Sequence, residues 1–208
     1  MWHVQLLLVL SCTTFLHLSD ACKCRQPHPQ EAYCQRDFVI KGNVKSQTVI
    51  GDQFGEKRFK VKVLQIFKGP TTWHTGQQIF IYTAVHGATC GVSLTKRTTY
   101  LLIGSLSNPK KPWITTCGFN REWSDIKKTV IDGISGDYEP NCACKICRGE
   151  PCGGMCPLFW NSTNCFYEHA VCRVACPETD ALGNPACRWD TPEPWWKCVK
   201  GQNVCRYN

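Results

Sequence analysis

The 17 cysteines of this 208-residue chain limit the folds that it can adopt. We expect residues 1–21 to be a cleaved secretory signal, because an apolar run over residues 4–10 is followed by the small residues Ser19 and Ala21. Cleavage after Ala21 would remove Cys12 and leave 16 cysteines, an even number. An even number of cysteines in an exported chain indicates disulfide bonds.

Zinc is the alternative for closely spaced cysteines, and Cys142, Cys144 and Cys147 have a suitable spacing for it. An oxidising compartment favours disulfides over zinc. A membrane-spanning helix needs about 20 consecutive apolar residues, and no stretch after residue 21 has that length and composition. We therefore expect a secreted, extracellular protein without a membrane span, and we expect it to be a monomer.

The cysteines are distributed unevenly along the expected mature chain. Six lie in residues 22–142 and ten in residues 143–208. The first part is long enough to bury an ordinary core, whereas the second is too short to do so without covalent cross-links. We therefore expect two domains, one over residues 22–142 and a disulfide-rich one over residues 143–208.

Short strand patterns dominate the first of these parts. Residues 58–67 alternate apolar side chains with lysines, which is the period of a half-buried strand. Similar runs, separated by turn residues, occupy residues 37–44, 78–82 and 100–103. We expect two flanking helices, one after Pro29 and one over residues 123–134. The pattern predicts a mainly β fold in which about five antiparallel strands close into a small barrel.

The formal net charge of +8 rises to +9 if Asp20 leaves with the signal. Positive charge favours anionic extracellular partners such as matrix polysaccharide. The alternative is that basic side chains only solvate exposed faces, and this alternative fits Lys57, Arg58, Lys60 and Lys62 better. Single-stranded nucleic acid would also suit a basic barrel, but export and many cysteines argue against a nucleic-acid partner.

The expected mature chain starts with Cys22-Lys-Cys24-Arg-Gln-Pro-His-Pro-Gln-Glu-Ala-Tyr-Cys34. This segment resembles the amino-terminal signature of the tissue inhibitors of metalloproteinases. Further matches follow in the family's order at residues 37–41, 67–69, 89–91, 114–117, 123, 144–146 and 151–152. The resemblance implies an OB-type, netrin-like barrel of five strands and a secreted inhibitor that has no cofactor of its own.

The same resemblance implies a set of disulfide bonds. They would be Cys22–Cys90, Cys24–Cys117, Cys34–Cys142, Cys144–Cys176, Cys147–Cys152 and Cys165–Cys187. Four cysteines lie outside the family's usual pattern, namely Cys156, Cys172, Cys198 and Cys205. Four cysteines allow three pairings, and the sequence does not choose among them.

A cysteine at the amino terminus has a chemical use in such an inhibitor. If Cys22 is the first residue, its nitrogen is a free amine, and the amine and the Cys22 carbonyl oxygen can chelate the zinc of a target protease. They would fill the position that a catalytic zinc keeps open for water. The resemblance places two segments against the protease, formed by Cys22, Lys23, Cys24, Arg25 and Gln26 and by Ala88, Thr89, Cys90 and Gly91.

Lys23 departs from the family, which usually has Thr or Ser after the first cysteine. The resemblance implies that this side chain enters the primary specificity pocket, which is largely apolar in matrix metalloproteinases. Burying an unpaired ammonium there costs several kcal/mol. We therefore expect a narrowed or shifted selectivity, towards zinc endopeptidases with a more polar pocket.

Three further interpretations concern other parts of the sequence. No nucleophile motif, HExxH or phosphate-binding loop is present, so we do not expect an enzyme. His28 has no other metal ligand at useful spacing, so we expect a structural role for it. Asn161-Ser-Thr163 is an acceptor for N-glycosylation.

The alternative function for the whole protein is a matrix-binding netrin-like module, which would not need a cysteine at its terminus.

Overall fold

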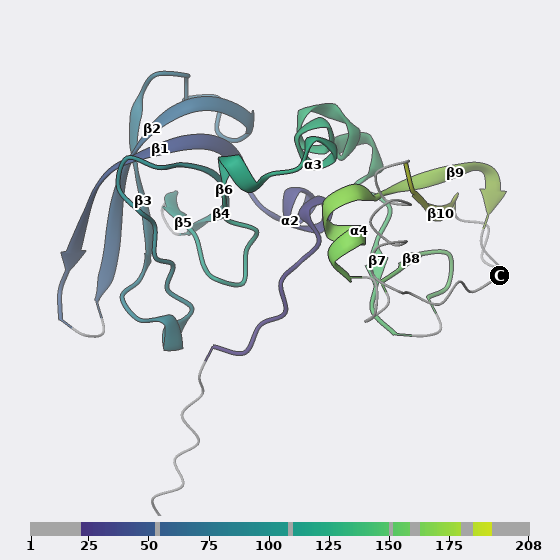
Figure 1. The fold of residues 1–208 in the computed structure, drawn as a ribbon, viewed down its shortest axis with the longest axis horizontal. Helices are drawn as coiled ribbons and strands as arrows, with labels where there is room; N and C mark the ends of the chain where they lie inside the picture. The colour runs from purple at the N-terminus through teal and green to yellow at the C-terminus, as the bar shows by residue number, and fades with distance from the viewer. Residues whose placement is uncertain are drawn as a thin grey trace, which may run out of the picture.

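The computed structural model describes residues 22–52, 55–107, 110–149, 152–158, 163–179 and 185–192. Six strands in these ranges form one sheet in the order β1-β2-β3-β5-β4-β6. They are β1 (Phe38–Ile50), β2 (Glu56–Lys68), β3 (Gln78–Ala84), β4 (Thr99–Ser107), β5 (Lys111–Trp113) and β6 (Arg121–Glu122). An additional pairing of β1 with β4 closes five of the strands into a ring (Figure 1).

The sequence alternation explains which side chains fill the ring. Phe59, Val61 and Val63 of β2 are fully buried, whereas Lys60 and Lys62 between them are exposed. The other inward residues come from the same alternation on the neighbouring strands, and they include Phe38, Ile40, Val44, Ile79, Ile81 and Leu102. Ile114, directly after β5, packs with them. The expected strands are therefore confirmed. The pairing of β3 with β5 is parallel, unlike the antiparallel pairing expected throughout.

A second cluster of apolar residues lies on the outer side of β1 and β4. Val39, Leu101 and Ile103 pack there against α2 (Pro29–Gln35) and against α3 (Lys128–Asp132) with the π-helical turn Gly133–Asp137 that follows it. The last part of this region is the 3₁₀ turn Glu139–Asn141. The helix expected after Pro29 is thus confirmed, and Pro29 occupies its first turn.

The expectation of one continuous helix over residues 123–134 is wrong. A 3₁₀ turn covers Trp123–Asp125, and the backbone is extended at Ile126 and Lys127 before α3 begins. The reason is tertiary packing of the aromatic ring. The Trp123 ring stacks on Phe67 with centroids 6.2 Å apart, and the Lys41 ammonium lies 4.0 Å from its centroid.

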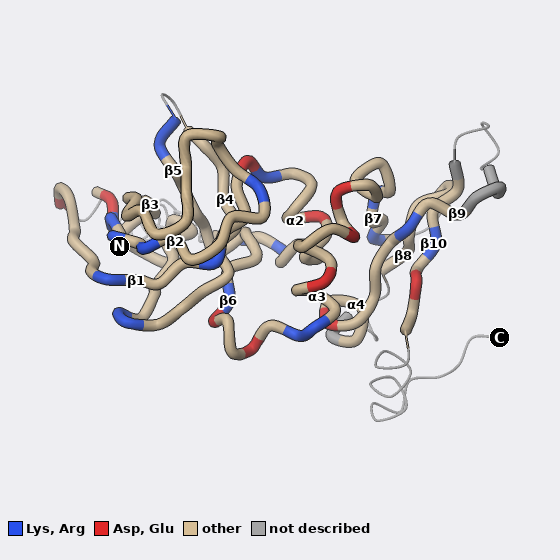
Figure 2. The backbone as a smooth tube through the Cα atoms, turned by 90° about the horizontal axis from the view of Figure 1, so that it is seen from above, with Lys and Arg blue, Asp and Glu red and all other residues tan. Residues whose placement is uncertain are grey.

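In Figure 2, the remaining elements lie on the side of α2 that faces away from the ring. Strand β7 (Ile146–Cys147) pairs in parallel with β8 (Cys156–Pro157), and β9 (Val171–Thr179) pairs antiparallel with β10 (Pro185–Asp190). Helix α4 (Thr163–His169) lies beside α3. None of the helices in the described residues is long and apolar enough to span a membrane.

Four of the disulfides are those that the resemblance implied. They are Cys22–Cys90, Cys24–Cys117, Cys34–Cys142 and Cys147–Cys152. Cys142, Cys144 and Cys147 are all bridged, so the disulfide interpretation of this cluster is confirmed over zinc.

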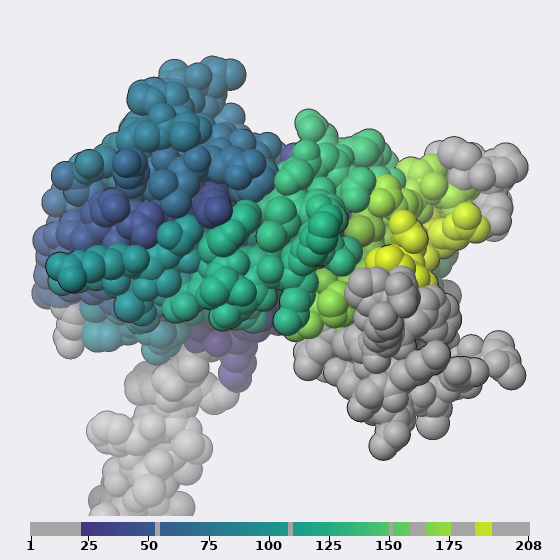
Figure 3. All heavy atoms as spheres, turned by 45° about the horizontal axis from the view of Figure 1, so that its top comes forward, coloured from purple at the N-terminus to yellow at the C-terminus, as the bar shows by residue number. Residues whose placement is uncertain are grey.

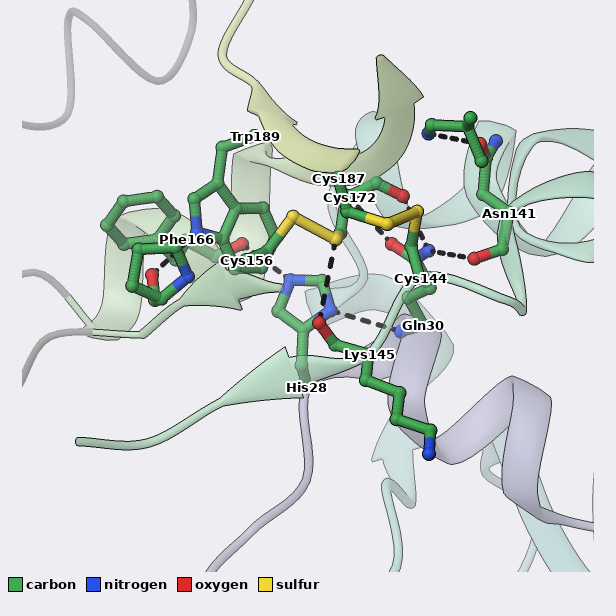
Figure 4. The surroundings of a disulfide bond; sticks show 12 residues. His28, Gln30, Asn141, Cys144, Lys145, Cys156, Phe166, Cys172, Cys187 and Trp189 are labelled. Carbon is green, nitrogen blue, oxygen red and sulfur yellow. Dashed lines mark hydrogen bonds between the residues drawn. A yellow bond between two sulfur atoms is a disulfide. The ribbon is translucent and has the colours of Figure 1, made fainter. Parts of the chain in front are cut away.

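Two of the expected pairings are wrong. Cys144 bonds to Cys187 rather than Cys176, so Cys165 cannot bond to Cys187, although Cys165 is itself disulfide-bonded. Cys156 bonds to Cys172. The pairing of β9 with β10 explains this arrangement, because it brings Cys172 and Cys187 together in one apolar cluster beside Cys144 and Cys156 (Figure 4). Cys198, Cys205 and Asn161 lie outside the described residues.

Candidate functional site

Two segments that are far apart in sequence meet at the start of the described chain. The Cys22 nitrogen donates a hydrogen bond of 2.8 Å to the Ala88 carbonyl oxygen, and the Cys22–Cys90 disulfide joins the same segments. We call residues 22–26 together with residues 88–91 the N-terminal ridge. The start of the described residues, coloured purple, lies at the lower edge of the molecule in Figure 3, and Lys23, Cys24 and Arg25 are exposed.

The second segment of the ridge has a backbone that tolerates little change. Its 3₁₀ turn Gly87–Thr89 is closed by hydrogen bonds from the Thr89 nitrogen and hydroxyl to the His86 carbonyl. Cys90 then takes a left-handed conformation with φ of 63°, which is costly for a residue with a Cβ. A Cβ on Gly91 would lie 2.2 Å from the Ala84 oxygen. The turn is therefore held in one conformation.

The two disulfides of the ridge pack against each other. The Cys22 sulfur lies 3.7 Å from the Cys24 sulfur and 3.6 Å from the Cys117 sulfur, and the Cys117 and Cys90 sulfurs are 3.5 Å apart. The four sulfurs have the spacing of a metal site, but only thiolates ligate metals well. Because all four cysteines are disulfide-bonded, the cluster cross-links the ridge rather than forming a metal centre.

Gln26 at the end of the ridge is held from two directions. The Arg121 guanidinium of β6 donates a hydrogen bond of 2.6 Å to the Gln26 side-chain oxygen. The Tyr167 hydroxyl of α4 donates one of 2.7 Å to the Gln26 carbonyl oxygen. Neither contact could be predicted from local sequence patterns, because Arg121 and Tyr167 lie 95 and 141 residues from Gln26.

His28 follows the ridge and has the structural role that we expected. It is fully buried, its Nδ1 accepts a hydrogen bond from the Gln30 nitrogen, and its Nε2 lies 2.9 Å from the Phe166 carbonyl oxygen. The neutral ring with its proton on Nε2 satisfies both contacts. Burial disfavours the imidazolium and lowers the pKa of His28 to about 4.

Helix α2 attaches this region to β9. The Gln30 side-chain nitrogen donates to the Cys172 and Asn141 carbonyl oxygens at 2.7 and 3.2 Å, and its oxygen accepts from the Cys172 nitrogen at 2.8 Å (Figure 4). Glu31 forms an ion pair with Arg148. Buried hydrogen bonds of this kind are costly to break because each leaves an unpaired polar group. The segment after the ridge is therefore fixed to the C-terminal elements.

Comparison with known proteins identifies the family. Residues 20–189 match the family model "Tissue inhibitor of metalloproteinase". The chain is 33% identical over 160 residues to metalloproteinase inhibitor 2 of Homo sapiens, covering 73% of this chain and 68% of that protein. It is 31% identical over 167 residues to metalloproteinase inhibitor 3 of Scyliorhinus torazame, covering 79% of this chain and 75% of that one. The chain therefore belongs to the tissue inhibitor of metalloproteinase family, whose members are protease inhibitors and not enzymes.

Proposed function

We propose that the mature protein is a secreted inhibitor of zinc metalloendopeptidases, such as matrix metalloproteinases, and that it acts through Cys22. The Cys22 amine nitrogen and carbonyl oxygen would chelate the catalytic zinc of the protease, so the inhibitor needs no cofactor of its own. The observation that carries this proposal is the attachment of Cys22 to residues 88–91 by one disulfide and one hydrogen bond. These contacts present the residue at the surface in a fixed position.

The chemistry of an amino terminus supports this role for Cys22. In a chain that starts there, the nitrogen is a primary amine, and α-amino groups have a pKa of about 7.7–8.0. An appreciable fraction of such groups is neutral near physiological pH. A neutral amine can donate one hydrogen to the Ala88 oxygen, the partner of this nitrogen in the structure, and still offer its lone pair to a metal. A bound amine and carbonyl would replace the water that a zinc protease needs for hydrolysis.

The rigidity of the ridge supports tight binding. A chain terminus usually frays, and ordering it on binding would reduce the affinity. Here Cys22 and Cys24 are each cross-linked, to Cys90 and to Cys117. Most of the ordering cost is therefore met during folding, before the protease is encountered.

We also infer how the chain is divided. The five-stranded ring corresponds to an OB-type, netrin-like barrel that makes up an inhibitory domain over residues 22–142. Residues 143–208 would then be a smaller, disulfide-rich domain. Supporting this division, the ring encloses its own apolar cluster, and a separate cluster surrounds Cys144, Cys156 and Cys172.

Inhibition assays test the proposed function. Purified protein that starts at Cys22 is titrated against a panel of matrix and disintegrin-type metalloproteinases, and inhibition of at least one member is expected. If the protein inhibits none of them, the proposal fails and the matrix-binding alternative gains weight. Binding to immobilised matrix polysaccharide is measured in parallel, because a matrix-binding module is the alternative function and the chain has a net positive charge.

The substitution Lys23→Thr is expected to widen the inhibition profile. Lys23 is exposed in the ridge. Burying its ammonium in an apolar protease pocket would cost several kcal/mol of binding free energy. We expect Lys23→Thr to lower the inhibition constant at least about tenfold for proteases with an apolar pocket, since tenfold corresponds to about 1.4 kcal/mol. Proteases with a polar pocket should respond less. Lys60→Thr, which also replaces an exposed lysine, is the control, and identical profiles for the two variants would show that Lys23 does not set selectivity.

A further inference from the structure

Gln26, which ends the first segment of the ridge, is held by hydrogen bonds. Gln26 and Arg25 line a cavity of about 560 Å³, and the same cavity is lined by Arg121 and Tyr167. On this side the segment therefore borders open space. Two hydrogen bonds cross to Gln26 here, one from the Arg121 guanidinium to its side chain and one from the Tyr167 hydroxyl to its backbone.

Tyr167 is itself firmly placed. Its neighbour Phe166 is buried in α4, and the Phe166 carbonyl oxygen is bound by the ring of His28. The His28 ring packs against the rings of Tyr167 and Trp189, with centroids 5.6 and 5.1 Å apart. The Tyr167 hydroxyl also interacts with the guanidinium of Arg148. A cation beside a hydroxyl oxygen polarises the O–H bond and so strengthens the hydrogen bond that the hydroxyl donates.

We propose that Tyr167 and Arg121 are positioning residues that brace the inhibitory segment, so that α4 in the C-terminal part of the chain is a component of the inhibitory site. This inference rests on the proposed function of Cys22. The two disulfides fix Cys22 and Cys24, and the burial of His28 fixes the chain on the far side of Pro27. The hydrogen bonds at Gln26 attach the stretch between these points, two residues after Cys24 and two before His28, and they set the orientation in which it leaves the disulfides.

The consequence concerns affinity and the rate of association. A braced segment holds Cys22 and Lys23 in the orientation required for binding, which reduces the ordering cost and increases the fraction of molecules competent to bind. Without these hydrogen bonds, the segment would have to adopt that orientation during each encounter of the inhibitor with the protease. Through the contact with Tyr167, the C-terminal part would increase the rate of association, although it contributes no residue to the proposed zinc chelate.

The substitution Tyr167→Phe in the full-length mature protein tests the inference. It removes the hydroxyl and keeps the ring that packs on His28. We expect association with an inhibited protease to become at least about fivefold slower, which corresponds to about 1 kcal/mol. The matched control is Tyr138→Phe, because the buried Tyr138 hydroxyl has no hydrogen-bond partner among the described residues. At β6, Arg121→Leu should also slow association, and Arg121→Lys, which keeps a donor, should restore part of the rate.

A second measurement does not depend on inhibition. Backbone ¹⁵N order parameters of residues 23–26 should be near the rigid value of about 0.85 in the wild type and fall towards about 0.6 in Tyr167→Phe. If the wild type inhibits and Tyr167→Phe matches Tyr138→Phe in both rate and order parameters, the brace is disproved and the proposed function stands. If the wild type inhibits no protease, the proposed function fails, and the order parameters alone decide whether Tyr167 positions the segment.

Discussion

An alanine added before Cys22 is expected to weaken inhibition by at least about a hundredfold, which corresponds to about 2.7 kcal/mol. The extra residue converts the Cys22 amine to an amide, whose nitrogen has no basic lone pair for a metal. It also places atoms where the zinc would lie. The fold should be unaffected, since the amide of Cys22 still donates to the Ala88 oxygen in the structure. Inhibition constants of the two forms measure the effect, and thermal unfolding midpoints confirm that stability is retained.

The control for this experiment is a protein of the same length with the alanine added after Asn208 instead. It should inhibit like the unmodified protein. Chemical acetylation of the Cys22 amine should weaken inhibition as the added residue does, because it also forms an amide. Equal inhibition by the alanine-extended and unmodified forms would contradict zinc chelation through the amine.

Acidification is expected to destabilise the protein through His28. The folded state lowers the pKa of this buried histidine from its ordinary 6.5 to about 4, so the unfolded chain binds the proton first as the pH falls. The contribution to stability is complete above pH 6.5, decreases between pH 6.5 and 4, and does not change further below pH 4. Its total is about 3 kcal/mol. Chemical denaturation at a series of pH values measures the free energy of unfolding across this window.

The variant His28→Asn isolates this contribution. Asparagine also accepts a hydrogen bond at the start of a helix, but it does not titrate in this range, so the dependence of stability on pH should become flatter. Glu31 and Arg148 next to His28 remain in the variant, as does His169, whose pKa burial also lowers. His74→Asn, which removes an exposed histidine, is the control. Equal slopes for His28→Asn and the wild type would disprove the role of His28.

The parts of the fold that were predictable from sequence are those governed by local patterns or by a close family match. Alternation identified β2, because Phe59, Val61 and Val63 share one face of a strand. Turn residues separated the neighbouring strands. The bridges from Cys22, Cys24 and Cys34 followed from the resemblance, and the structure contains all three.

The parts that could not be predicted depend on contacts between distant residues. The periodicity of residues 123–134 is helical, but stacking of Trp123 on Phe67 interrupts the helix. The bridges Cys144–Cys187 and Cys156–Cys172 depend on how β9 pairs with β10, which no local pattern specifies. The same holds for the site: the sequence indicated Cys22 and the turn at Cys90, whereas the contact of Tyr167 with Gln26 became visible only in three dimensions.

X-ray absorption at the zinc edge tests the central claim most directly. The measurement uses the complex of the mature protein with a protease that carries only its catalytic zinc. If Cys22 chelates the metal, the zinc should gain a nitrogen or oxygen ligand at about 2.0–2.2 Å relative to the free protease, with no sulfur at about 2.3 Å. An unchanged ligand shell in an inhibited complex, or a sulfur ligand, would contradict the proposed mechanism.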